Sequence, residues 1–307
     1  MTRKLTLMTG TSHHPTAFIV LNPVAGIGNA GLLERAIESR FHHFGWTTRI
    51  HRTQPDEDTP AIVAAELARG VDLVVAAGGD GTVASVLAGM AHSHVPLGIL
   101  PTGTWNAIAR NLKLPFTVFR AIQLMVGDHN IKKLDLMEVG DSLHAMNLSM
   151  GISVNMIKSS SREEKRKFGI ISYLTNLFKQ VVGWKMNRYT IDADGVRYRG
   201  RASEIFVANY GMMGIAAIEK RLNVIPDDGK VDLLILRPRT FLDLPALIWQ
   251  ALIKREKRAP KYREISAIKT LTIRTTPPMQ VQADGDLIGV TPIKITVIPR
   301  AVRVIVP

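Results

Sequence analysis

A turn of three glycines around one aspartate, Gly78-Gly79-Asp80-Gly81-Thr82, is the first feature of the sequence that could do chemistry. Glycines let the backbone approach a ligand closely and turn its N–H groups toward it, and a helix that follows adds its positive end. These features together favour a phosphate-binding turn. Asp80 would then bind Mg²⁺ or accept a proton from an attacking hydroxyl. The alternative is a tight turn in which Asp80 caps the next helix.

Two further turns carry small, hydrogen-bonding side chains, at residues Asn22 to Gly28 and Gly103 to Asn106. Neither matches a Walker A loop or a Gly-x-Gly-x-x-Gly fingerprint. Each follows a short apolar run, as the Gly78 turn does. Three such turns converging on one edge of a sheet indicate a nucleotide site, and three unrelated structural turns are the alternative.

Paired acidic residues occur in two turns near the end of the chain. Asp284-Gly285-Asp286 places two carboxylates around a glycine between expected strands, which is also a strong hairpin sequence. Asp227-Asp228-Gly229 is compatible with a plain turn or with a hard-cation site built from carboxylate and backbone oxygens.

The elements that must position these turns alternate between strands and helices over the first 130 residues. Apolar runs at Ala17–Leu21, Val71–Ala77 and Leu97–Leu100 predict strands, and Trp46–Ile50 alternates as a half-buried strand should. Thr59 predicts the N-cap of a helix, and Pro60 is typical of its first turn. This order predicts an α/β domain with a parallel sheet and flanking helices, whose ligand lies beyond the carboxyl ends of the strands.

After about residue 130 the sequence changes to β-branched runs, which predict a mainly antiparallel β domain interrupted by two helices. We expect an α/β domain at 15–130, with the last C-terminal residues able to pack back on it, a β-rich domain at 131–307, and a cleft between them. The predicted strands span 131–139, 203–209, 231–236, 267–273, 293–298 and 302–306, and the predicted helices span 168–182 and 241–253.

Composition excludes several classes of chemistry. The chain has no Cys, so disulfide scaffolds, thiolate zinc sites, iron–sulfur clusters and cysteine nucleophiles are all ruled out. No apolar run is long enough to span a bilayer, and the first fifteen residues lack the apolar core of a signal peptide. We therefore expect a cytoplasmic protein.

The formal net charge of +13 predicts an anionic partner. Lys158–Arg188 carries a net +6 and Lys254–Arg263 a net +5, so the charge is concentrated in the second half. An apolar helical stripe from Ile170 to Val181 lies beside basic residues 165–167, which suggests a face that rests on an anionic membrane. An amphipathic helix packed on the core is the alternative. Nucleic acid is not expected as a partner, because only 6% of the residues are aromatic.

The ordered set of motifs resembles the diacylglycerol kinase catalytic-domain superfamily, the bacterial lipid kinases that also include sphingosine and ceramide kinases. The likeness covers nearly the whole chain. It rests on Asn22-Pro23 with Gly26, Thr53, Gly78 to Thr82, Pro96 to Pro101 leading to Gly103-Thr104 and Asn106, Gly151, Asp228-Gly229 and Asp284-Gly285-Asp286.

The resemblance implies ATP bound between the domains, together with Mg²⁺. The nucleotide contacts would come from Asn22, Pro23, Gly26, Thr53, Gly78, Gly79, Asp80, Gly81, Thr82, Gly103, Thr104 and Asn106. A Mg²⁺ would lie at Asp228, with the backbone carbonyls of Ile225 and Lys230. The family's Asp-Gly-Glu motif is held to supply the catalytic base, which here would be Asp284 or Asp286. In the mechanism that we expect, Asp80 orients the metal–nucleotide complex and Asp284 takes the hydroxyl proton.

The sequence departs from the family pattern at a few positions. Ala107 and Ser153 stand where the family commonly has an acidic residue, Ser85 stands where a Glu often follows the glycine turn, and Asp286 is one methylene shorter than the usual Glu. These changes affect the identity of the acceptor and leave the phosphate-binding turns untouched.

The expected function is therefore an ATP-dependent lipid kinase that acts on a diacylglycerol-like or sphingoid-like hydroxyl and associates peripherally with an anionic membrane. Two alternatives stay open. One is a phosphotransferase like the nicotinamide-dinucleotide kinases, which share the Gly-Gly-Asp-Gly turn. The other is a basic nucleic-acid-binding protein without catalysis.

Overall fold

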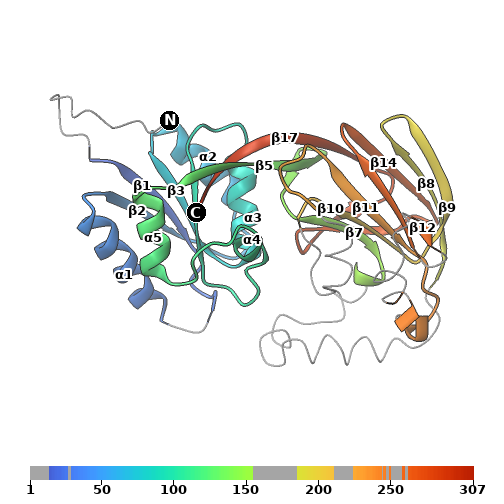
Figure 1. Cartoon of the computed structure of the whole chain (residues 1–307), viewed down its shortest axis with the longest axis horizontal. Helices are drawn as coiled ribbons and strands as arrows, with labels where there is room; N and C mark the ends of the chain where they lie inside the picture. Colours follow the sequence, from blue (N-terminus) through green and yellow to red (C-terminus); the bar gives the residue numbers. More distant parts are fainter. Residues whose placement is uncertain are drawn as a thin grey trace.

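Two halves of the molecule are joined by a pair of long strands, β5 (Asn130–Val139) and β17 (Ile293–Val306) (Figure 1). The structure is a computed structural model that describes residues 14–26, 29–154, 185–210, 224–243, 245–246, 249, 258–259 and 262–307. Among these residues, no helix is both long and apolar enough to cross a membrane.

The first half is a parallel sheet between two layers of helices. Its strands are β1 (Thr16–Leu21), β2 (Thr47–Arg52), β3 (Leu73–Gly78) and β4 (Leu97–Pro101), in the spatial order β2-β1-β3-β4. The helices are α1 (Ala30–His43), α2 (Thr59–Ala68), α3 (Asp80–Gly89), α4 (Ala107–Asn111) and α5 (Val118–Val126). The predicted α/β domain is confirmed.

Burial on both faces explains the continuous apolar strands of this sheet, because alternate residues of a strand point to opposite faces. Phe18 and Val20 of β1 join a core with α2, α3 and α4, whereas Ala17, Ile19 and Leu21 join a second core with α1 and α5. Helices therefore cover both faces of the sheet, so a ligand can reach this sheet only at the ends of its strands.

The second half is a sandwich of mainly antiparallel strands, as predicted. Its remaining elements are β6 (Ser142–His144), β7 (Asn147–Gly151), β8 (Asn187–Ala193), β9 (Val196–Ala202), β10 (Glu204–Ala208), β11 (Val231–Leu236), a 3₁₀ turn η1 (Phe241–Asp243), β12 (Arg258–Ala259), β13 (Tyr262–Ala267), β14 (Thr270–Thr276), β15 (Gln280–Ala283) and β16 (Asp286–Val290). The sheet β12-β13-β11-β10-β7-β15-β16 packs on β8 and β14 of the other sheet through one apolar core.

One sheet crosses both halves through β17. The first residues of β17 pair with β14, Val304 near its end pairs with Leu97 of β4, and β5 runs antiparallel beside both portions. The prediction of two separate strands at 293–298 and 302–306 is wrong. Pro299 and Arg300, the latter at φ +53°, lie where the register with β5 shifts, so the strand bulges without ending.

Two other local predictions need correction. The predicted strand at 267–273 is two strands, because Ile268 and Lys269 form a turn whose N–H groups donate to the Asp194 carboxylate at 2.6 and 2.9 Å. Helix α2 is capped by Asp58 ahead of Thr59. Of the predicted helix 241–253, residues 241–243 form η1, and the described residues 245, 246 and 249 are helical, in agreement with the prediction. The predicted helix 168–182 lies outside the described residues.

Candidate active site

Four of the predicted segments lie at the carboxyl ends of four neighbouring parallel strands. Thr53 follows β2, the Asn22–Gly26 turn follows β1, the Gly78–Thr82 turn closes β3, and the Gly103–Asn106 turn follows β4. Parallel strands present their carboxyl ends at the same edge of a sheet. The fold therefore gathers these segments along one edge.

Direct contacts join the Asn22 turn to its neighbours. The Asn22 side-chain amide donates to the Thr82 hydroxyl at 3.1 Å, and the Thr53 N–H donates to the Leu21 carbonyl at 2.9 Å. Gly26 has φ +78°, and a Cβ there would lie 2.3 Å from the Thr102 carbonyl oxygen. Only glycine permits this turn to approach the turn after β4 so closely.

The two glycine turns after β3 and β4 touch each other. A Cβ on Gly103 would lie 2.4 Å from the Cα of Gly79, and the Thr102 N–H donates to the Gly78 carbonyl at 3.1 Å. Asn106 fixes the second turn from within: its side-chain oxygen accepts from the Gly103 N–H at 2.9 Å, and its amide donates to the Gly103 carbonyl at 2.7 Å. Because its amide group is used inside the turn and is buried, Asn106 acts on a ligand only by positioning Gly103 and its neighbours.

The start of helix α3 has backbone N–H groups without a side-chain cap. Gly79 is the N-cap residue and makes no capping hydrogen bond, and a Cβ on Gly81 would meet nothing within 4 Å. The N–H groups of a first helical turn have no partner inside the helix, and the positive end of the helix dipole lies beside them. This turn therefore offers open space and N–H donors to an anion.

Asp80 is the first residue of α3, and its carboxylate braces a different helix. One carboxylate oxygen accepts from the Ile108 N–H of α4 at 3.1 Å. The interpretation of Asp80 as the cap of the helix that follows it is therefore wrong, because the side chain reaches across to the next one. Its second oxygen has no partner within the described ranges, which leaves it available to a cation.

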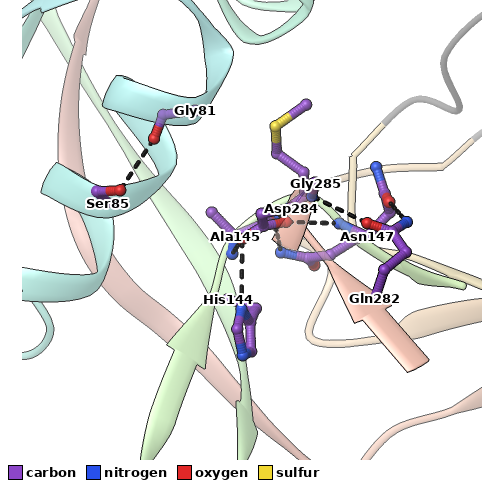
Figure 2. Close-up of polar contacts among 10 residues, drawn as sticks. Gly81, Ser85, His144, Ala145, Asn147, Gln282, Asp284 and Gly285 are labelled. Carbon is purple, nitrogen blue, oxygen red and sulfur yellow. Dashed lines mark hydrogen bonds and ion pairs between the residues drawn. The ribbon is translucent and has the colours of Figure 1, made fainter. Parts of the chain in front are cut away.

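Asp284, directly after β15, is held by backbone N–H groups at the start of the neighbouring strand β7. Its carboxylate accepts from the N–H groups of Ala145 and Met146 at 2.9 Å and of Asn147 at 3.0 Å, and the His144 Nδ1 lies 3.6 Å away (Figure 2). A carboxylate has about four lone-pair positions, and three are used here. Asp284 thus shapes its turn, in which it takes φ +49°.

Asp286, two residues later, has the opposite surroundings. It begins β16, and its side chain is exposed. That side chain has no hydrogen-bond or ion-pair partner in the part of the chain that the structure describes. Of the two carboxylates in this turn, Asp286 is therefore the one whose lone pairs are free to accept a proton.

The glycine turns and the Asp284 turn come together where the two halves meet. Helix α3 packs against β6, and the residues directly after β6 hold the Asp284 carboxylate. Figure 2 shows Gly81 and Ser85 of α3 in the same view as Asp284, His144 and Ala145. The fold thus brings together motifs that lie about 200 residues apart in the sequence.

A buried chain of hydrogen bonds leads from Gly285 into the sandwich. The Gly285 N–H donates to Gln282, whose amide donates to the Ser149 hydroxyl at 2.8 Å, and Ser149 pairs with Ser153 at 2.6 Å. Ser153 then donates its hydroxyl to Glu204 at 2.5 Å. Burial raises the pKa of Glu204 to about 7, although the hydrogen bonds from Ser153 act in the opposite direction.

The predicted cation site at Asp228 is a turn fixed by the buried Asp135. Asp135 of β5 accepts from the Gly229 N–H at 2.6 Å and from the Arg300 N–H at 2.7 Å, and burial together with Asp227 and Asp228 raises its pKa. The Asp228 carboxylate accepts from the Lys230 N–H at 3.1 Å, and the Lys230 ammonium lies 3.9 Å from its other oxygen.

No group of three or more His, Asp or Glu side chains is placed to hold a metal ion within the described ranges. A cation at Asp228 would depend on that one carboxylate and on the carbonyls of Ile225 and Lys230, so this site stays a prediction.

Sequence reasoning missed four polar residues of this region: Asp135, His144, Glu204 and Gln282. Asp135 and Glu204 are acidic residues within or beside apolar runs, and this pattern indicates buried carboxylates. His144 and Gln282 show no such pattern. Their roles arise from neighbours more than 100 residues away.

Comparison with known proteins agrees with this arrangement. Residues 16–139 match the family described as "Diacylglycerol kinase catalytic domain", and residues 147–306 match the "YegS C-terminal NAD kinase beta sandwich-like domain". A Streptococcus pneumoniae protein named "Putative lipid kinase" is 26% identical over 94% of this chain and 97% of its own. A protein of the same description from Staphylococcus haemolyticus is 28% identical over 78% of each chain. The crystal structure of a diacylglycerol kinase from Bacillus anthracis shares the fold, with a TM-score of 0.75 and 24% identity over 97% of this chain and 99% of that one.

Proposed function

The chain belongs to the family in which a diacylglycerol kinase catalytic domain is followed by a YegS C-terminal NAD kinase beta sandwich-like domain, and we propose that it transfers the γ-phosphoryl group of ATP to a lipid hydroxyl. The observation that carries this proposal is the contact between the two glycine turns at the carboxyl edge of the sheet, next to the uncapped start of α3. Such a site suits a polyphosphate, because close backbone approach and free N–H groups are what phosphates bind.

The nucleotide half of the site would be built from main-chain groups. The N–H groups of Asp80, Gly81 and Thr82 at the start of α3 would hold phosphate oxygens, and the open space at Gly81 admits them. The free Asp80 oxygen would hold Mg²⁺. When bound, that ion would neutralise charge on the phosphates, which is the main requirement of a loose phosphoryl-transfer transition state.

Asp286 would act as the proton acceptor. As the acceptor hydroxyl oxygen forms its bond to the γ-phosphorus, the bond from that phosphorus to the bridging oxygen of ADP breaks, and the hydroxyl proton passes to the Asp286 carboxylate. Asp284 would serve this step indirectly, because its three N–H bonds fix the turn that carries Asp286. This assignment departs from our expectation that Asp284 takes the proton.

A lipid is the acceptor that the comparisons favour, since several relatives are named as lipid kinases. A diacylglycerol-like or a sphingoid-like alcohol would each supply the hydroxyl. The substrate would then lie in a bilayer, and the net charge of +13 suits a peripheral protein on an anionic membrane. The apolar helical stripe predicted within 168–182 and the basic residues 165–167 beside it, which we expect to form such a face, lie outside the described residues.

A radiolabelled-ATP assay against a panel of lipids and nicotinamide dinucleotides tests the proposal. The panel would include diacylglycerol, monoacylglycerol, sphingoid bases, ceramide and undecaprenol, and we expect label in a lipid. Asp80→Asn keeps an oxygen for the Ile108 N–H and removes the charge, so the rate should fall on the order of 10²–10⁴. Glu38→Gln, on the exposed surface of α1, is the matched control and should keep the wild-type rate.

Two results would overturn the proposal. Near-parental activity of the Asp80→Asn protein would remove Asp80 from the site. Label in dinucleotides alone would instead support the dinucleotide kinase alternative, which the second family description makes the natural competitor.

A further inference from the structure

Four half-exposed aromatic rings lie in or next to helices α1, α4 and α5 of the first half of the molecule. Trp105 is 53% exposed, Phe116 46%, Phe119 52% and Phe44 38%. Large aromatic side chains are seldom left this open in a group, and exposed apolar groups of this kind mark interaction sites. We call these four residues, together with the neighbouring cations Arg40, Arg110, Lys113 and Arg120, the aromatic–arginine face.

Guanidinium groups lie over these rings in two clusters, and the segment from Trp105 to Arg120 links the clusters along the chain. The Arg40 guanidinium lies 3.6 Å from the ring centre of Phe119 and 4.7 Å from that of Phe44. Arg110 lies 5.0 Å from the ring centre of Phe116 and donates to the Trp105 carbonyl at 2.8 Å. The buried Nε of Arg40 has no hydrogen-bond partner among the described residues, so this cation is held by rings and by no acid.

The segment from Trp105 to Arg120, which carries three of the four rings, has only basic charged side chains. From Gly81 to Gly127 the sequence contains no Asp or Glu, whereas Arg110, Lys113 and Arg120 are all exposed. A surface that combines aromatic rings with unopposed cations is complementary to the headgroup layer of an anionic bilayer, where rings settle at the interface and guanidinium groups pair with phosphates.

We propose that the aromatic–arginine face docks on an anionic membrane. The inference rests on the proposed function in one respect: Trp105 directly follows Thr104 of the nucleotide turn, so docking here would hold the carboxyl edge of the sheet close to a lipid substrate. A second copy of this chain is the competing occupant. Two cationic faces would repel each other, which favours the bilayer.

Co-sedimentation with vesicles of phosphatidylcholine, alone or mixed with phosphatidylglycerol, tests the charge of the face. Lys113→Gln with Arg120→Gln removes two cations whose side chains have no ion pair or hydrogen bond within the described ranges, and Arg197→Gln with Arg201→Gln on the exposed strand β9 removes the same charge elsewhere. Each cation near the surface is worth about fivefold in binding, so the first pair should lose roughly 25-fold on the anionic vesicles. The second pair should bind nearly as wild type does.

Substitution of the rings tests the apolar part. Phe116→Ser with Phe119→Ser should weaken vesicle binding roughly tenfold or more. Val196→Ser with Val290→Ser, at side chains that are each 54% exposed on the second half, should leave it unchanged. Melting temperatures confirm that each variant is folded. If the ring variant has a lowered melting temperature, the proposal is judged on the vesicle binding of the Lys113→Gln, Arg120→Gln variant alone.

The outcomes separate this proposal from the proposed function. Loss of vesicle binding confined to the face variants supports docking, whatever lipid is phosphorylated, because binding needs no activity. With a short-chain acceptor dispersed in detergent, the face variants should keep the wild-type rate. Equal binding by face and control variants would overturn the proposal. So would wild-type protein that ignores anionic vesicles, or face variants that only convert a dimer to a monomer in sedimentation velocity.

Discussion

Glu204 predicts an unusual pH dependence of stability. Its carboxyl group lies at the end of the buried chain from Gly285, and burial raises its pKa from 4.5 to about 7. The folded state therefore holds a proton that the unfolded state releases between these two pH values. The free energy of unfolding should fall as the pH rises from about 4.5 to about 7 and then stay at the lower level.

The size of the effect follows from the pKa difference. About 2.5 pH units at about 1.36 kcal/mol each give a loss of about 3 kcal/mol. Glu204→Gln keeps the size and much of the hydrogen bonding with Ser153 and carries no charge at any pH. The amide of Glu204→Gln can change the free energy of unfolding by an amount that does not depend on pH. This amount cancels when the difference between the variant and wild type is compared at two pH values. At pH 8 the variant should therefore be about 3 kcal/mol more stable, relative to wild type, than it is near pH 4.5.

Urea unfolding followed by circular dichroism, at intervals from about pH 4.5 to 8, measures this difference. Glu38→Gln, which removes an exposed acid from α1, corrects for the general effect of losing one negative charge. A difference between wild type and Glu204→Gln that stays flat across the range would refute the reasoning. So would a difference that changes in the opposite direction.

Three further predictions concern the glycine turns and the acidic turn. Gly81→Ala should leave the melting temperature unchanged and weaken ATP binding roughly tenfold or more, because the methyl group would enter the open space that we propose for a phosphate. Gly103→Ala should instead cost about 1–3 kcal/mol of stability, because its Cβ would lie 2.4 Å from a backbone atom. Equal ATP affinity in Gly81→Ala and wild type by calorimetry would contradict the first expectation. Asp284→Asn should lower stability by about 1.5–3 kcal/mol through its lost N–H acceptors, while Asp286→Asn should keep stability and lose on the order of 10²–10⁴ in rate. The reverse pattern, in melts and steady-state kinetics, would return the base to Asp284. Asn106→Ala removes two hydrogen bonds from a left-handed position and should cost about 1–3 kcal/mol in urea unfolding, so an unchanged unfolding midpoint would show that the brace is unimportant.

The succession of strands and helices along the first half of the chain, and the positions of its turns, could be predicted from the sequence because they depend on local spacing. Apolar runs such as Val71–Ala77 end at glycines, and parallel strands necessarily present those ends at one edge. The strand at 293–306 was divided in the prediction because Pro299 is typical of a break. Pairing with β5 along both portions keeps it one strand, and this pairing partner lies about 160 residues away.

In the acidic turn, local spacing does not predict which carboxylate is hydrogen-bonded. Asp284 and Asp286 are equivalent in the sequence, and both flank one glycine. They differ only because N–H groups 137 to 139 residues away converge on the first and leave the second exposed. A hydrogen bond to a distant strand has no trace in the local pattern.

By itself, the sequence determined that this protein has glycine-bearing turns at its strand ends, an α/β half and a β-rich half, because residue type and spacing govern the backbone within a few residues. The tertiary structure alone decided which carboxylates form hydrogen bonds, that Asp135 and Glu204 are buried, and that four aromatic rings of the first half stay half exposed. The physical reason is that solvent exposure and hydrogen-bond partners are properties of the packed chain, and packing joins segments that the sequence keeps far apart.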